Sequence, residues 1–156
     1  MMKLILTTLI LFFTLLSCQQ PTNKVKSNAE TNEELAKRLG ADEYGMKKYV
    51  MAFLKRGPNP SKDSITAAKN QKAHLENIGR MAEEGTLVLA GPFLDGTDLR
   101  GIYIFNVETI EEAQKLTATD PLIQSGGLIM ELHPWYGSAG LMELSKIHKK
   151  ISEKNP

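Results

Sequence analysis

Short apolar runs separated by polar breaks predict a four-stranded sheet. The first run carries apolar side chains on both phases, which is typical of a strand buried on both sides. The second and third runs flank a loop with the turn signal Asp95-Gly96, so we expect them to form an antiparallel hairpin. We expect Pro134 to stop the fourth strand. The four predicted strands are residues 48–55, 86–90, 101–107 and 128–133.

Apolar residues at helical spacing fill the gaps between these strands. Asp63 or Ser64 is suited to cap the first helix, and Gly85 to end it. Its predicted apolar stripe consists of Ile65, Ala68, Leu75, Ile78 and Ala82. His74 lies at the edge of that stripe. A second helix starts at Glu108 or Thr109 and carries Ile110, Ala113 and Leu116 on one side.

The resulting order β-α-β-β-α-β predicts an α+β, ferredoxin-like domain with a four-stranded antiparallel sheet. We place this domain at residues 46–137. Residues 19–45 are expected to form a polar tether with a short helix at 32–39, and residues 138–156 a C-terminal helical tail that Ser138 caps.

Two helices can cover only one face of such a sheet. Because the first three strands are apolar on both phases, the other face would be a large exposed apolar surface. We therefore expect a homodimer in which the sheets of two subunits pack together. The C-terminal helix is the alternative cover for part of this face.

The first residues predict an export signal. Lys3 precedes an apolar run at 4–16, which is short for a membrane span but suited to a signal peptide. The run ends in Leu15-Leu16-Ser17-Cys18, which resembles the lipobox of bacterial lipoproteins, with Cys18 as the lipidation site. A plain secretory signal with an incidental cysteine is the alternative. Gln19 stands where a retention signal would place Asp, so we expect a lipoprotein in the outer membrane of a Gram-negative bacterium.

Charge and cysteine content narrow the classes of partner. The chain of 156 residues has 19 Lys and Arg against 18 Asp and Glu, and cleavage before Cys18 removes one lysine and no acid. The mature chain is thus formally neutral. There is no long basic run, so nucleic acid is not an expected partner. Attachment to a bilayer would depend on the acyl chains of Cys18.

Few residues in this sequence suit chemistry. Phosphate-loop, dinucleotide and metal-ligand motifs are absent, so we expect neither a cofactor nor a metal site. Within the domain, His74 is the histidine on a predicted helix, and Asp120 precedes Pro121 at the start of a short turn. His74 can be a packing residue and Asp120 a helix cap. If the fold joins them, Asp120 would orient the imidazole for acid/base work.

Several segments together resemble the YCII-related family. They are residues 48–58, 85–92, 101–105 and 133–137, with His74 and Asp120-Pro121 between them. The resemblance implies a dimeric α+β barrel with a His/Asp pair in a cleft, matching His74 and Asp120. Most relatives are small cytosolic proteins of unassigned activity, and one is similar to chloromuconolactone-type dehydrohalogenases. The signal, tether and C-terminal helix of this chain depart from that pattern.

We expect a lipid-anchored domain with a small-molecule cleft that catalyses proton transfer, elimination or isomerisation. Arg56 would bind an anionic group, and Trp135 and Tyr136 would wall the pocket. Their alternatives are an exposed loop charge for Arg56 and core or dimer packing for the two aromatic residues. The competing hypothesis is a non-catalytic binding or scaffold protein of the cell envelope.

Overall fold

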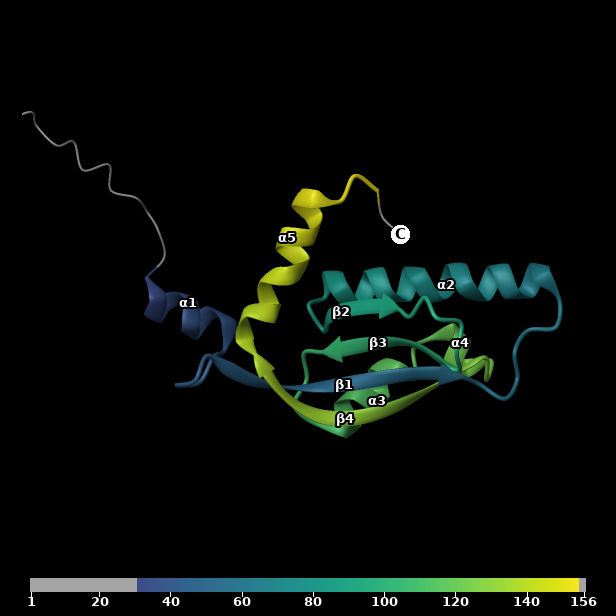
Figure 1. Cartoon of the computed structure of the whole chain (residues 1–156), viewed down its shortest axis with the longest axis horizontal. Coiled ribbons are helices and arrows are strands. Elements are labelled where there is room, and N and C mark those ends of the chain that lie inside the picture. Colours follow the sequence, from purple (N-terminus) through teal and green to yellow (C-terminus); the bar gives the residue numbers. More distant parts are fainter. Residues whose placement is uncertain (1–30, 155–156) are drawn as a thin grey trace, which may run out of the picture.

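A computed structural model describes residues 31–154 of the chain (Figure 1). The signal, Cys18 and most of the tether lie outside the described residues. In chain order the elements are α1 Asn32–Leu39, β1 Met46–Arg56, α2 Ser64–Glu83, β2 Leu87–Pro92, β3 Leu99–Phe105, α3 Ile110–Thr117, α4 Pro121–Gln124, β4 Leu128–Ser138, the 3-10 helix η1 Ala139–Glu143 and α5 Leu144–Ile151.

The four strands form one antiparallel sheet in the order β2-β3-β1-β4. This confirms the α+β, ferredoxin-like fold. β1 lies in the centre and pairs with β4 over its whole length, from Met46 opposite Ser138 to Arg56 opposite Leu128. β2 and β4 are the two edges. The expected hairpin is confirmed, because β2 and β3 are adjacent and antiparallel.

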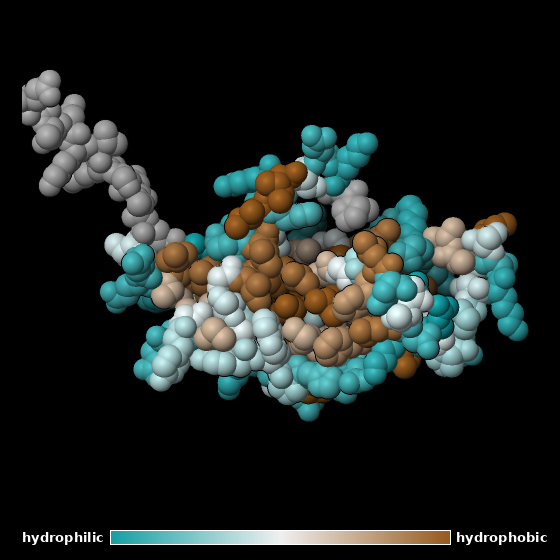
Figure 2. All heavy atoms as spheres, in the orientation of Figure 1, coloured by the Kyte–Doolittle hydropathy of each residue, from teal (hydrophilic) through white to brown (hydrophobic). Residues whose placement is uncertain are grey.

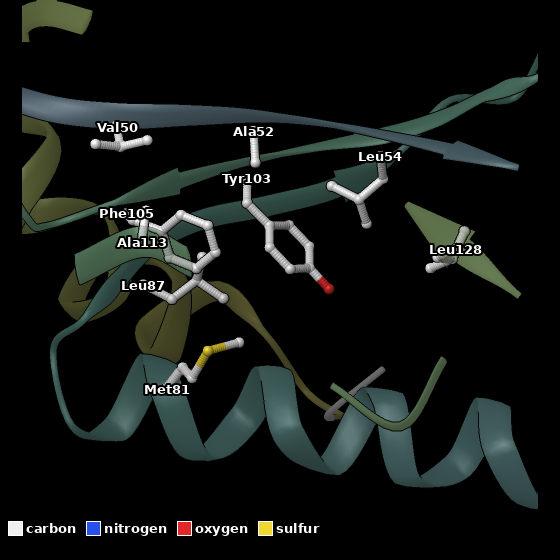
Figure 3. Packing of buried hydrophobic residues seen from close by; sticks show 9 residues of the cluster. All are labelled: Val50, Ala52, Leu54, Met81, Leu87, Tyr103, Phe105, Ala113 and Leu128. Carbon is white, nitrogen blue, oxygen red and sulfur yellow. The ribbon is translucent and has the colours of Figure 1, made fainter. Parts of the chain in front are cut away.

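Helices α2 and α3 cover one face of the sheet and enclose the main core. Figure 3 shows side chains from β1 and β3 pointing toward α2, with Tyr103 and Phe105 between the two layers. Buried residues of this core are Val50, Ala52, Leu54, Met81, Leu87, Tyr103, Phe105, Ala113 and Leu128. The alternation of β1 is the reason, since Val50, Ala52 and Leu54 all point to the helix-covered face.

The opposite face of the sheet is only partly covered. Tyr49, Val88 and Ile104 are buried there, against Leu141 and Met142 of η1 among others. Farther along, Ile129 is 48% exposed, and Figure 2 shows apolar side chains gathered over the middle of the sheet. The C-terminal segment thus covers one end of this face. A dimer that would cover the rest stays a prediction.

The expected apolar stripe of α2 is wrong in three of its members. Ile65 is 82% exposed, Leu75 is 37% exposed and Ala68 is also exposed, whereas His74 and Asn77 are buried together with Met81. The helix is therefore turned so that a polar pair faces the core. Its ends are as expected, with Asp63 accepting a hydrogen bond from the Thr66 backbone and Gly85 at φ 73°.

The expected end of the fourth strand at Pro134 is wrong. β4 continues to Ser138, and Pro134 lies opposite Val50 within it. β4 is an edge strand, where a residue without a backbone N–H can be accommodated. Ser138 then caps η1 rather than a single long helix, and α5 follows directly. Among residues 31–154, no helix has both the length and the apolar content needed to cross a bilayer.

Candidate functional site

His74 and Asp120 meet inside the helix-covered layer, although 46 positions separate them in the chain. Nδ1 of His74 lies 2.7 Å from Oδ2 of Asp120. The carboxylate is fully buried and the side chain of His74 is 9% exposed. α2 supplies the histidine from its buried face, and the connection from α3 to α4 supplies the acid. The contact that the spacing alone could not establish is therefore present.

Each of the two carboxylate oxygens of Asp120 has a hydrogen-bond partner. Its Oδ1 accepts a hydrogen bond from the Leu122 backbone at 2.9 Å, as the N-cap of α4. Its Oδ2 faces His74, and an ionised carboxylate can only accept, so the imidazole carries its proton on Nδ1. Nε2 of His74 then has a free lone pair. A carboxylate that fixes the tautomer in this way leaves Nε2 as the basic atom.

Tyr103 is a member of the site that the sequence did not single out. Its hydroxyl lies 3.3 Å from Nε2 of His74, and the two rings are stacked with centroids 6.3 Å apart. Burial and the negative charge of Asp120 raise the pKa of Tyr103 above its ordinary value, so the hydroxyl keeps its proton. It can therefore donate to Nε2, over a length that makes a weak hydrogen bond.

A second polar group lies one helical turn farther along α2. Oδ1 of Asn77 accepts hydrogen bonds from Arg80 at 2.8 Å and from the Thr119 hydroxyl at 3.1 Å. These contacts join α2 to the residue next to Asp120. The amide nitrogen of Asn77 is buried without a hydrogen-bond partner. The polar side chains thus link α2 to the α3–α4 connection at two successive turns.

The comparisons with known proteins identify the family of this chain. The model of the YCII-related domain matches residues 49–136, which is more than half of the chain. The chain belongs to the YCII-related family. The matched residues of this YCII-related domain contain β2 and β3 whole, most of β1 and β4, and both His74 and Asp120. They do not contain α1 or α5.

Two proteins show how far the likeness of this YCII-related protein extends. The uncharacterized protein YjpA of Bacillus subtilis (strain 168) is 34% identical over 62 residues, which are 40% of this chain and 71% of YjpA. The structure of 5-chloro-2-hydroxyhydroquinone dehydrochlorinase (TftG) from Burkholderia phenoliruptrix AC1100, in complex with 2,5-dihydroxybenzoquinone, is 18% identical with a TM-score of 0.42. The match covers 57% of this chain and 93% of the TftG chain. That likeness is too distant to transfer a site or a reaction.

Arg56 lies at the far end of β1 from Trp135 and Tyr136. In this YCII-related domain Arg56 is opposite Leu128, whereas Tyr136 is opposite Lys48. Eight residues of strand separate those two positions of β1, about 26 Å at the usual rise. Nε of Arg56 lies 3.1 Å from Asp98, in an exposed ion pair. A single subunit therefore does not bring these three expected substrate contacts together.

Trp135 and Tyr136 line a cavity of their own. It has a volume of about 260 Å³ and is formed with Lys48, Tyr49, Glu108 and Pro134. The ring of Trp135 packs on Tyr49, on the sheet face opposite His74, with ring centroids 5.8 Å apart. The Tyr136 hydroxyl donates to Asp42. Neither side chain has a described contact with His74, so packing accounts for Trp135.

The open sheet face carries a separate charged cluster. Nε2 of His133 lies 2.8 Å from Glu131, which also binds Lys55, and the His133 ring packs edge-on against Phe53. Lys55 and His133 together lower the pKa of Glu131. The cluster is exposed, and it contains one acid and one imidazole only. Within residues 31–154, no group of three His, Cys, Asp or Glu side chains could hold a metal ion.

Proposed function

We propose that this chain is a membrane-anchored YCII-related protein that moves a proton on a small organic molecule with His74 as the base. The observation that carries the proposal is the buried contact of 2.7 Å between His74 and Asp120. A histidine held by a buried carboxylate has a fixed tautomer and a defined basic atom, which are the requirements of a general base.

The geometry supports one sequence of proton transfers. Nε2 of His74 accepts a proton from a C–H or O–H bond of the substrate, and the electron pair of that bond stays on the substrate. Asp120 stabilises the imidazolium that forms. Return of the proton to another atom completes an isomerisation. Departure of a leaving group with its electron pair gives an elimination, and the imidazolium then passes its proton to the leaving group or to water. Each step needs only a substrate, water and the imidazole.

Access to Nε2 is the condition on this mechanism. The Tyr103 hydroxyl lies at 3.3 Å from Nε2, in the direction from which a substrate must approach. A bound molecule has to displace this hydroxyl or pass its proton to Nε2 through it. The hydrogen bond is long, so its replacement by a substrate bond costs little. Catalytic hydrogen bonds are often long before the substrate binds.

A second candidate function follows from the burial of the pair. The side chain of His74 is 9% exposed, and the two cavities described for residues 31–154 are lined by other residues. A pair that stays closed is a structural link between α2 and α4, and the protein would then be a non-catalytic ligand-binding or scaffold protein. The cavity at Trp135 is its candidate ligand site.

The anchor and the assembly complete the proposal. Acylation of Cys18 would fix the protein to a bilayer, with the outer membrane of a Gram-negative bacterium as the proposed site. Two subunits would pack through the open sheet face around Ile129 and Phe53, because a monomer leaves this apolar face exposed. Light scattering of the mature chain tests the assembly, and a monodisperse monomer would contradict it.

Arg56 remains the proposed contact for an anionic group.

A ligand screen with matched histidine variants tests the site. Small carboxylic acids and hydroxylated ring compounds are screened by thermal shift, and each hit is incubated in heavy water to follow C–H exchange by NMR. We expect exchange or turnover in the wild type and in His133→Ala, whose imidazole is exposed, and a loss of at least 100-fold in His74→Ala. Exchange or turnover at the wild-type rate in both His74→Ala and Asp120→Asn would rule out His74 as the base. Binding that never leads to exchange would favour the second candidate.

A further inference from the structure

The last helix projects from the domain with an apolar stripe that the described residues do not cover. Leu144, Ile147 and Ile151 recur at the spacing of one helix face. Leu144 is half-buried against the domain, but Ile147 is 52% and Ile151 75% exposed. Figure 1 shows α5 rising from the end of η1, and α5 contacts the edge strand β2. A helix of eight residues is not stable by itself, so this stripe indicates a surface on which α5 rests.

The polar side of α5 is basic. Lys146, Lys149 and Lys150 are exposed on it, and Lys146 pairs with Glu143 at 3.1 Å. Lys154 follows the helix, and Glu153 is the one acid between residues 144 and 154. A short helix with an apolar stripe between lysines is typical of helices that lie on an anionic bilayer surface. Two α5 helices packed together would instead bring their lysines close to one another.

The position of α5 relative to the start of the domain agrees with a bilayer as its partner. Nη1 of Arg38 in α1 lies 2.6 Å from Glu143 in η1, so α1 and the base of α5 are joined at one end of the sheet. Residues 19–30 connect Cys18 to this end. A chain of twelve residues can span at most about 40 Å. An acylated Cys18 would therefore keep α5 within reach of the headgroups.

We propose that α5 is a second membrane contact, with Ile147 and Ile151 at the boundary of headgroups and acyl chains and Lys149 and Lys150 at the level of anionic phosphates. The proposal rests on the acylation of Cys18 proposed above. It adds a lipid preference that acyl chains alone do not provide, because the lysines favour anionic headgroups. It also orients the domain, since two contacts at one end of the sheet hold that end toward the bilayer.

A single-site fluorescence experiment tests the contact. Cys18 is the only cysteine, so Ser152→Cys adds one free thiol, which carries an environment-sensitive dye in the acylated protein. The protein is placed in vesicles with or without phosphatidylglycerol, and spin-labelled lipids are used as quenchers. We expect a blue shift and quenching in the anionic vesicles. The same dye at Lys62, in the connection between β1 and α2, should show neither.

Variants of exposed residues identify the forces without disturbing the fold. Ile147→Ser with Ile151→Ser should abolish the shift. Lys149→Gln and Lys150→Gln should each lower the equilibrium constant for contact of α5 with the anionic bilayer about fivefold, as expected for one lysine near an anionic surface. Lys115→Gln on α3 removes the same charge at a distant site and should change nothing.

The outcomes separate failure of α5 from failure of the anchor. Mass spectrometry shows whether Cys18 is acylated. If it is acylated and the dye at residue 152 shows no shift, or shows the same shift in neutral vesicles, the α5 proposal is wrong. A shift already present in the lipid-free, unacylated mature chain, with Cys18→Ser so that the dye reacts only at residue 152, would mean that a second protein copy covers α5, and would overturn it as well. If Cys18 is not acylated, the anchor proposal fails, and binding of that chain to anionic vesicles then decides α5 alone.

Discussion

Asp120→Asn is the change that probes the buried pair most directly. The side chain keeps its size, and an amide oxygen can still accept from the Leu122 backbone, which lies 2.9 Å from Oδ1. The other carboxylate oxygen, 2.7 Å from Nδ1 of His74, becomes an NH2 group. Two donors would then face each other, so His74 must move its proton to Nε2 and accept at Nδ1.

The structure allows the cost to be worked out. The new Nε2–H points at the Tyr103 hydroxyl, 3.3 Å away, which must turn from donor to acceptor. All three groups stay paired, but a bond to a charged group, about 1.5–3 kcal/mol, is replaced by a neutral one of about 0.5–1.5 kcal/mol. We expect Asp120→Asn to lower the free energy of unfolding by about 1–2 kcal/mol. Asp120→Ala leaves two buried donors unpaired and should cost about 2–6 kcal/mol.

Two measurements check this reasoning. Urea unfolding gives the free energies, and long-range ¹H–¹⁵N spectra in alkaline buffer show which imidazole nitrogen of His74 carries the proton. We expect Nδ1–H in the wild type and Nε2–H in Asp120→Asn, where the basic lone pair would point into the protein and activity would be lost. A matched control is Asp63→Asn at the N-cap of α2, which faces no imidazole. Asn and Asp cap equally well, so the control should have little effect.

The interpretation would be refuted by either of two results. One is a wild-type His74 protonated at Nε2 only, because Asp120 could then not be the acceptor that fixes the tautomer. The other is an Asp120→Asn protein as stable as the Asp63→Asn control with an unchanged tautomer.

Four further substitutions test the packing of the domain. Since the pKa of Tyr103 is raised in the folded protein, the unfolded chain loses the phenol proton at a lower pH than the folded chain does. The free energy of unfolding should therefore fall by up to about 1.4 kcal/mol per pH unit above 10.0. Tyr103→Phe should remove this contribution, which urea unfolding at several alkaline pH values measures. Gly57→Ala would place Cβ 2.2 Å from the carbonyl oxygen of Gly126, so a loss of about 1–3 kcal/mol is expected, whereas Gly79→Ala, with open space in α2, should gain about 1 kcal/mol. Met81→Ala should lower the melting temperature through a loss of about 2–5 kcal/mol, because Met81 is 1% exposed; a loss below 1 kcal/mol would contradict its place in the core.

The strands and helix starts were predictable because local signals determine them. Thr109 and Glu112 form a capping box at the start of α3, and Gly40 and Gly85 end helices in the left-handed conformation. Alternation along β1 likewise identified its two faces. These features depend on neighbours in the chain, so the sequence contains the necessary information.

The rotation of α2 was not predictable, because its buried face is polar. Hydrophobic periodicity placed Ile65 and Leu75 inward, but they are exposed, and His74 and Asn77 are buried instead. A histidine belongs in a core only when a partner satisfies it, and Asp120 comes from a distant segment. The family resemblance indicated this pair; periodicity did not.

Tyr103 shows the same limit from the side of the sheet. Tyr103 is a buried residue of the helix-covered core. The position of its hydroxyl beside Nε2 of His74 depends on how far α2 lies above the sheet, a distance that no local pattern contains. The same holds for Arg56 and Tyr136, whose separation along β1 follows from the register with β4.

The proline within β4 has a consequence for how copies of this protein meet. β4 forms one edge of the sheet and is 11 residues long, so its outer side is a potential template for strand addition and aggregation. Pro134 lies near the middle of this edge and supplies no N–H group. An added strand would therefore meet an interrupted ladder, and growth of the sheet from chain to chain is disfavoured. The edge is thereby protected against fibre-like stacking, while the broad face of the sheet stays open to a partner.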